Sequence, residues 1–95
     1  RMKSCFQTPG KLFSLGEVEN SVIFPGVRIG KGAKVTNAVI MPSTVIGDNA
    51  VVDYAIIAQN CDIQADAHVE GALGAITVVA EGETVDAAAG SKQVG

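Results

Sequence analysis

Apolar and small residues recur at a fixed interval of 17 positions through the middle of the chain. The segment Ile29-Gly-Lys-Gly-Ala-Lys-Val35 reappears as Ile46-Gly-Asp-Asn-Ala-Val-Val52, and the next step of 17 reaches Ile63-Gln-Ala-Asp-Ala-His-Val69. A step backwards aligns Asn20-Ser-Val-Ile-Phe-Pro-Gly26 with Asn37-Ala-Val-Ile-Met-Pro-Ser43. A short fixed period of this kind indicates that one small structural unit is stacked on copies of itself.

Within each unit, large aliphatic residues occupy three positions, separated by intervals of six, five and six. A smaller residue lies two positions before each of them, and this alternation is typical of short strands in which every second side chain points inward. A helix would need apolar residues at intervals of three and four, and Gly, Asn and Pro interrupt the units too often for that. The three columns of large residues are Leu12, Ile29, Ile46 and Ile63; Val18, Val35, Val52 and Val69; and Ile23, Ile40 and Ile57.

The bends between strands need residues that tolerate a positive φ angle, and the repeat supplies them at two positions. These residues are Gly32, Asn49 and Asp66 at one position and Gly26, Ser43 and Asn60 at the other. Three short strands with a bend after each build a triangular coil. We therefore predict an all-β fold, a parallel β-helix with about 17 residues per coil and about four to five coils.

The regular pattern predicts that the β-helix spans residues 12–86, with Leu12 in the same column as Ile29. Residues 1–11 are interpreted as a linker or a leftover connecting segment, and residues 87–95 as a flexible tail. After Val69 the register breaks, and residues 76–85 are expected to form one more strand and bend that cap the stack. Because the chain opens on Arg1 and its first repeats are incomplete, we expect a C-terminal piece of a longer protein.

The composition and charge of the chain argue against nucleic-acid and membrane partners. Ninety-five residues suffice for one domain, and a net charge of −3 with seven scattered basic residues argues against a nucleic-acid partner. No apolar run approaches the roughly 20 residues that a membrane helix requires, so we expect no membrane partner. Cys5 and Cys61 are too few for a disulfide framework, which favours a cytoplasmic location.

Few residues are candidates for catalytic or metal chemistry. His68 lies between the inward residues Ala67 and Val69, so we expect it to point into solvent. Cys61 shares a small inward position with Thr44, which favours packing over thiol reactivity. Four aspartates fall at different outward positions and do not form a convergent metal site; they are Asp48, Asp53, Asp62 and Asp66. We therefore expect no catalytic, cofactor or metal site in these residues.

Two surface features are candidates for binding. Stacked outward apolar residues predict a contiguous patch that docks a catalytic domain or a second subunit. The residues of this patch are Val22, Val39 and Ile56, with Phe24, Met41 and Ala58 two positions further on. Arg28, Lys31 and Lys34 are candidates for contact with an anionic effector, although plain solvent exposure also accounts for them.

The unit matches the hexapeptide-repeat signature, an aliphatic residue often followed by Gly, with a small residue four positions on. In this respect it resembles the left-handed β-helices of sugar nucleotidyltransferases and acyltransferases. The sequence is also similar to the C-terminal domain of bacterial glucose-1-phosphate adenylyltransferase (ADP-glucose pyrophosphorylase) in three segments. These are Gly16-Glu-Val-Glu-Asn-Ser-Val-Ile-Phe-Pro-Gly-Val-Arg-Ile-Gly-Lys-Gly-Ala-Lys-Val35, Val39-Ile-Met-Pro42 and Val45-Ile-Gly-Asp-Asn-Ala-Val-Val52. The resemblance extends to Ala75-Ile-Thr-Val-Val-Ala-Glu-Gly82. The chain departs from the family in a rewritten or shortened first coil, before Gly16, and in a brief loop near Gly71 to Gly74.

This resemblance implies a left-handed coil and a parent enzyme that joins ATP and glucose 1-phosphate into ADP-glucose and pyrophosphate for glycogen synthesis. It places Mg²⁺, ATP and the Gly-rich phosphate loop in an N-terminal catalytic domain outside these residues. It gives this domain a role in subunit assembly, in a homo- or hetero-oligomer that is a tetramer in the family, and in allosteric regulation. Two alternatives stay open, a free-standing hexapeptide acyltransferase and a purely structural oligomerisation module.

Overall fold

A computed structural model describes the backbone of residues 2–3, 6–7, 12–14 and 16–87, and the side chains of residues 16–87. Its strands form three parallel sheets of five strands each, and the described residues contain no α-helix. The first sheet, sheet A, contains β1 (Met2–Lys3), β4 (Glu17–Glu19), β7 (Lys34–Thr36), β10 (Val51–Asp53) and β13 (His68–Glu70).

Sheets B and C complete each coil, because the chain passes through the three sheets in turn. Sheet B contains β2 (Phe6–Gln7), β5 (Val22–Ile23), β8 (Val39–Ile40), β11 (Ala55–Ile57) and β14 (Thr77–Val79). Sheet C contains β3 (Leu12–Ser14), β6 (Val27–Ile29), β9 (Val45–Ile46), β12 (Asp62–Ile63) and β15 (Thr84–Val85).

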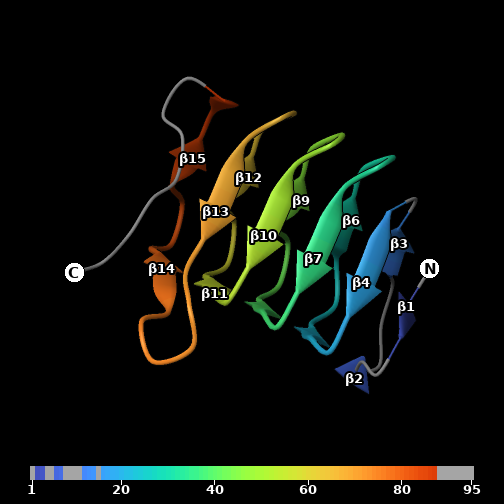
Figure 1. Cartoon of the computed structure of the whole chain (residues 1–95). Coiled ribbons are helices and arrows are strands. Elements are labelled where there is room, and N and C mark those ends of the chain that lie inside the picture. Colours follow the sequence, from blue (N-terminus) through green and yellow to red (C-terminus); the bar gives the residue numbers. More distant parts are fainter. Residues whose placement is uncertain (1, 4–5, 8–11, 15, 88–95) are drawn as a thin grey trace.

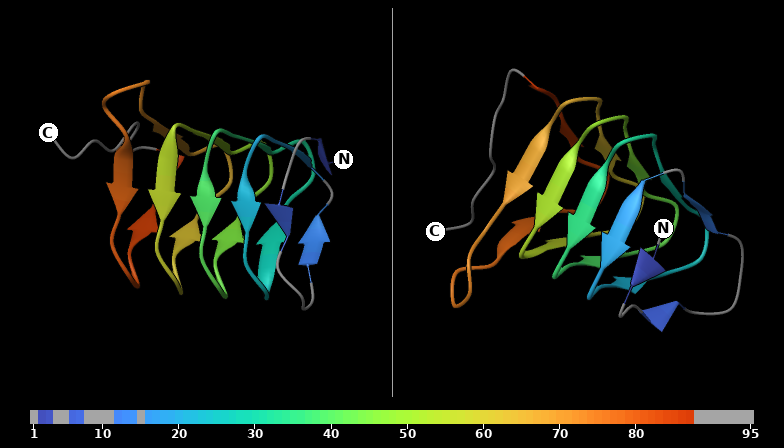
Figure 2. Two further views of the ribbon diagram at one scale, coloured as in Figure 1. Left: turned by 90° about the horizontal axis from the view of Figure 1, so that it is seen from below. Right: turned by 45° about the vertical axis from the view of Figure 1, so that its right-hand side comes forward.

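The coils wind in a left-handed sense. In Figure 1 the strands of sheet A run downward at the front, the chain returns upward behind them, and each coil advances from right to left. Figure 2 shows the same stack from below and from the side, with the sheets as walls of a prism. The predicted parallel β-helix is therefore confirmed, and its hand is the known exception to right-handed crossover connections.

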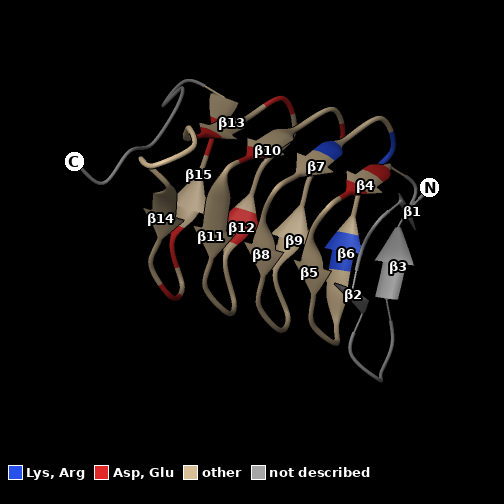
Figure 3. Cartoon of the chain, turned by 60° about the horizontal axis from the view of Figure 1, so that its bottom comes forward, with Lys and Arg blue, Asp and Glu red and all other residues tan. Residues whose placement is uncertain are grey.

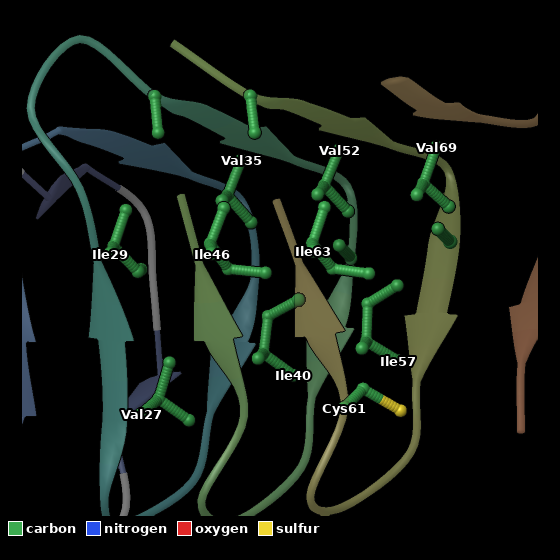
Figure 4. Packing of buried hydrophobic residues seen from close by; sticks show 14 of the residues in the cluster. Val27, Ile29, Val35, Ile40, Ile46, Val52, Ile57, Cys61, Ile63 and Val69 are labelled. Carbon is green, nitrogen blue, oxygen red and sulfur yellow. The ribbon is translucent and has the colours of Figure 1, made fainter. Parts of the chain in front are cut away.

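The core of the prism consists of ladders of like residues. Between β7, β10 and β13 the register places Val35 beside Val52 and Val52 beside Val69, and all three side chains are fully buried. Figure 4 shows Ile29, Ile46 and Ile63 stacked in the same way along the interior. Because strand neighbours are about 4.8 Å apart, each residue packs on its own counterpart in the next coil.

Polar side chains that point inward are hydrogen-bonded to the backbone. The Thr44 hydroxyl donates to the carbonyl oxygen of Ala58 at 2.7 Å, and the Thr77 hydroxyl donates to that of Glu70 at 2.9 Å. Ser21 donates to the Glu19 carbonyl at 2.9 Å and accepts from the Ala38 amide at 3.1 Å. A buried hydroxyl without a partner would destabilise the fold, and these three are satisfied.

Three corners of the prism use a positive φ, one more than the sequence predicted. The predicted corners are confirmed, with φ of 75° at Gly32 and 60° at Asn49, and of 77° at Gly26 and 62° at Ser43. A third corner, between sheets A and B, has φ of 53° at Asn20, 50° at Asn37 and 48° at Tyr54. Asn tolerates this conformation, whereas for an aromatic residue such as Tyr it is uncommon.

The glycine that follows the isoleucine of sheet C leaves room for the next coil. A Cβ on Gly47 would lie 2.5 Å from the amide nitrogen of Ala65 and 2.7 Å from the carbonyl carbon of Gln64. Gly30 is in the same situation against the backbone of Gly47 and Asp48. The equivalent residue one coil further on is Gln64, which is exposed.

The first coil departs from the 17-residue register. Leu12 pairs with Val27, and Ser14 pairs with Ile29, so the expected place of Leu12 in the Ile29 column is wrong. Strands β1 and β2 lie within the segment that was interpreted as a linker, and they pair with β4 and β5. The stack therefore begins before residue 12. The 17-residue pattern does not detect this first coil, because the coil is shorter than the others.

The last coil is longer than the others. Ile63 pairs with Val85, an offset of 22 residues, because the segment between β13 and β14 makes a small hairpin. Residues 76–85, expected as one strand and bend, contain two strands, β14 and β15, in different sheets. Of the expected tail, only Ala87 lies within the described residues.

Replacing Gly47 with Ala is expected to lower the free energy of unfolding by about 1–3 kcal/mol, because the new methyl group overlaps the backbone of the next coil. Urea denaturation followed by circular dichroism measures the loss. Gln64→Ala is the matched control and should change stability by less than about 0.5 kcal/mol, as for an ordinary surface substitution. Equal losses in the two variants would contradict the steric explanation.

Candidate functional site

The outer face of sheet B carries the predicted apolar patch. Val22 pairs with Val39, Val39 with Ile56, and Ile56 with Val78, so the outward ladder continues one residue beyond the prediction. Val22, Val39 and Ile56 are half-buried, and Val78 is exposed. The structure thus brings these predicted patch residues together in one row across the face.

Phe24 and Met41 lie at one side of this row. Both are half-buried, and their amides donate to the carbonyl oxygens of Ile40 at 3.0 Å and Ile57 at 2.9 Å in the next coil. They follow β5 and β8 toward the corner with sheet C. The apolar face is therefore wider than the strands themselves.

A groove runs along the other side of the row. Its volume is about 440 Å³, and it lies between the sheet face and the hairpin that precedes β14. The floor includes Val39 and Ile56, and Tyr54 lines one side. Leu73 and Ile76 form the hairpin wall, with exposed fractions of 87% and 46%. Sequence reasoning missed Leu73, Ile76 and Val78, although the break in register after Val69 marked the place where an apolar loop leaves the stack.

A polar pocket of about 390 Å³ adjoins the groove at the corner between sheets A and B. Asn20 and Asn37 line both cavities, and the Asn20 side-chain amide donates to the Asn37 side-chain oxygen at 2.6 Å. Asp53 accepts two hydrogen bonds through Oδ1, from the Thr36 hydroxyl at 2.6 Å and from the Asn37 amide at 3.2 Å. This ladder joins three successive coils at the corner, so Asp53 has a structural role here.

The three basic candidates lie around a different corner and on different surfaces. Arg28 is exposed on β6 in sheet C, and Lys34 is exposed on β7 in sheet A, where it pairs with Glu17. Figure 3 shows these basic positions of β6 and β7 in blue. Lys31 lies in the bend between them, where its backbone amide donates to Asp48 Oδ1 at 3.0 Å. The structure thus places them in one coil and does not gather them in either of the cavities described above.

The remaining polar candidates do not converge. His68 Nδ1 lies 3.6 Å from Glu70 Oε1 on the exposed side of sheet A, so its predicted outward orientation is confirmed. Cys61 is buried, and its Sγ lies 3.0 Å from the carbonyl oxygen of Ala80, which agrees with a packing role. Within residues 16–87, no three His, Cys, Asp or Glu side chains are grouped so that they would hold a metal ion.

In the comparison with protein families, a family model matches residues 2–73. The matching model is described as GlmU-like, C-terminal hexapeptide. The comparison with curated proteins found no match. In the described part of the chain, no helix is long and apolar enough to cross a membrane.

The Asp53→Ala variant is expected to lower the free energy of unfolding by about 1–3 kcal/mol, because Thr36 and Asn37 lose a shared, part-buried acceptor. Thermal or urea denaturation provides the measurement. Asp62→Ala, on the exposed side of β12, is the control and should be close to neutral. If the two variants were equally stable, the corner ladder would contribute nothing measurable.

Proposed function

Because the chain belongs to the GlmU-like, C-terminal hexapeptide family, we propose that it is the assembly and regulatory domain of a glucose-1-phosphate adenylyltransferase. The family relates it to nucleotidyltransferase and acyltransferase proteins. The resemblance of residues 16–35 and 45–52 to the adenylyltransferase C-terminal domain supports the nucleotidyltransferase of these two chemistries.

The apolar face of sheet B is the single observation that carries an assembly role. Inward side chains fill the core of the β-helix. A row of outward aliphatic side chains beside an apolar groove therefore contributes nothing to the interior. Contiguous apolar surface of this kind is typical of docking sites for other domains or subunits. The proposed partners are the N-terminal catalytic domain and other subunits of a homo- or hetero-oligomer.

The catalytic step is assigned to a part of the enzyme outside this chain. The 95 residues contain no Gly-Lys-Ser/Thr phosphate loop, and Gly30-Lys-Gly32 is the bend between β6 and β7. In the proposed enzyme, ATP and Mg²⁺ are held by the catalytic domain. The β-helix domain would influence the reaction through the contact that it makes with the catalytic domain and the other subunits.

Regulation by an anionic effector is the second part of the proposal. Arg28, Lys31 and Lys34 are exposed at or beside the bend between β6 and β7, and a sugar phosphate that reached this corner from a neighbouring domain would meet two or three cations. Glu17 and Asp48 lie beside Lys34 and Lys31 and partly compensate their charge. The effector site would therefore be completed by groups from the partner.

A free-standing acyltransferase is the second candidate, and His68 is the observation in its favour. Its imidazole is half exposed, and its Nδ1 lies 3.6 Å from Glu70 Oε1, so a carboxylate lies beside a candidate general base. His68 lines neither the groove nor the polar pocket described above. The nucleotidyltransferase assignment is therefore preferred.

The full-length protein that contains this chain is expected to release pyrophosphate from ATP and glucose 1-phosphate in the presence of Mg²⁺, and sugar phosphates should change the rate. A coupled pyrophosphate assay measures both. The His68→Ala variant should keep the activity, because His68 has no part in the proposed reaction. Transfer of an acyl group from an acyl thioester that is abolished by His68→Ala would support the second candidate and contradict the first.

Changing Lys31 and Lys34 together to Ala is expected to weaken the response to a sugar-phosphate effector by about tenfold or more in half-saturating concentration, since two cations near the anion are removed. The rate without effector should stay unchanged. Glu17→Gln provides a control that alters the same surface without removing a cation. An unaltered effector response in the double variant would exclude this corner as the effector site.

A further inference from the structure

Tyr54 stands where the two preceding coils have asparagine. Asn20, Asn37 and Tyr54 occupy equivalent positions at the corner between sheets A and B, with φ of 53°, 50° and 48°. Asparagine adopts this left-handed conformation at little cost, whereas an aromatic residue is strained there. Strained residues that depart from the locally preferred type are found most often at functional sites. The departure therefore directs attention to what the Tyr54 ring contacts.

The corner column lies where the two cavities meet. Tyr54 lines the groove of about 440 Å³, and Asn20 and Asn37 line both this groove and the polar pocket of about 390 Å³. Sites for small molecules have volumes of about 300–1,000 Å³, so each cavity is large enough for one. The two cavities share the asparagines, and a ligand longer than one ring could occupy both.

The lining combines an apolar surface with fixed hydrogen-bonding groups. Val39 and Ile56 form the floor of the groove beside the Tyr54 ring. The Asn20 amide donates to Asn37 Oδ1 at 2.6 Å, and the Asn37 amide donates to Asp53 Oδ1 at 3.2 Å. An amide nitrogen carries two hydrogens, so each asparagine has a second hydrogen that can be donated to a ligand. The ladder holds both amides in place before a ligand arrives.

The charge of the lining selects a neutral ligand. Among the described residues that line the two cavities, Glu19 alone is charged. A carboxylate accepts hydrogen bonds from hydroxyl groups and repels phosphate or another carboxylate. The basic residues Arg28, Lys31 and Lys34 lie around a different corner of the prism. The chemistry of the site therefore fits an uncharged molecule that is rich in hydroxyl groups.

We propose that this corner binds a neutral oligosaccharide, with a pyranose ring stacked on Tyr54 and its hydroxyl groups bonded to Asn20 and Asn37. A pyranose ring has C–H groups on its faces and hydroxyl groups around its edge, so it requires an aromatic or apolar surface beside fixed polar groups. Successive positions of the corner column are about 4.8 Å apart along the axis, so a chain of sugars that lies along the column meets one position in each coil. This site goes beyond the proposed function and does not depend on it.

The site is tested by isothermal titration calorimetry of the 95-residue chain with maltohexaose and with cellohexaose, which carry α and β linkages. At least one of them is expected to bind in the millimolar range or more tightly. The Tyr54→Asn variant should raise the dissociation constant by about tenfold, as for loss of a moderate hot-spot residue. The Tyr54→Phe variant should bind like the wild type, because it keeps the ring.

The stability of the variants separates binding from packing. Tyr54→Asn should keep or raise the midpoint of thermal unfolding, because asparagine is the residue of the two preceding coils and tolerates the positive φ. Asn37→Gly also tolerates this φ and removes the amide, and it should raise the dissociation constant by about fivefold. Asn49→Gly is the matched control at the corner between sheets C and A, where Gly32 is the equivalent residue, and it should not change the dissociation constant.

The proposal is overturned if neither glucan binds, or if Tyr54→Asn leaves the dissociation constant unchanged. A variant Tyr54→Asn that lost both stability and affinity would assign the ring to packing and would also overturn it. The outcome is separable from that of the proposed function. Changing Lys31 and Lys34 together to Ala should leave glucan binding intact. Release of pyrophosphate by the full-length protein without glucan binding overturns this site alone, whereas glucan binding without that activity leaves the site standing.

Discussion

Backbone hydrogen bonds between successive coils are the constraint on which the other features of this protein depend. In the regular coils each strand pairs with the strand 17 residues further on, so a residue meets its own counterpart above and below. The interior must therefore be uniform along the axis, as in the ladder of Ile23, Ile40 and Ile57. The same spacing leaves no room for a side chain at Gly47, because the next coil passes within contact distance.

The same ladders sort the surface into faces of different character. An outward residue is also stacked on its counterpart, so an apolar residue that recurs with the repeat becomes a row, and a polar residue becomes a hydrogen-bonded ladder. Val22, Val39 and Ile56 form such a row on sheet B, while Asn20 and Asn37 form a ladder at the corner beside it. The fold by itself does not specify a function, and the proposed assembly role depends on the residues at the outward positions of the repeat.

The coil that breaks the repeat supplies the feature that the regular coils lack. Between β13 and β14 the chain leaves the stack, and it returns to pair Thr77 with Ala55, with the Thr77 hydroxyl bonded to the carbonyl of Glu70 at 2.9 Å. The excursion places the exposed Leu73 beside the apolar groove on sheet B. A regular coil can present only rows flush with the sheet. A projecting residue and a groove therefore require an insertion, and it occurs near the end of the stack, where only one coil must adapt to it.

The sequence by itself determined the fold, the coil length and two of the three corners. In a parallel ladder with a constant offset, equivalent positions have the same environment, so similar residues recur at that interval, as Ile29, Ile46 and Ile63 do. It also identified the row of Val22, Val39 and Ile56. Only the tertiary structure decided where the period fails. The first coil is shorter, so Leu12 pairs with Val27, and the last is longer, so Leu73 joins the face of a sheet to which it is not aligned. A pattern that rests on a constant offset carries no information once the offset changes, and these contacts are set by how the irregular coils pack on the regular ones.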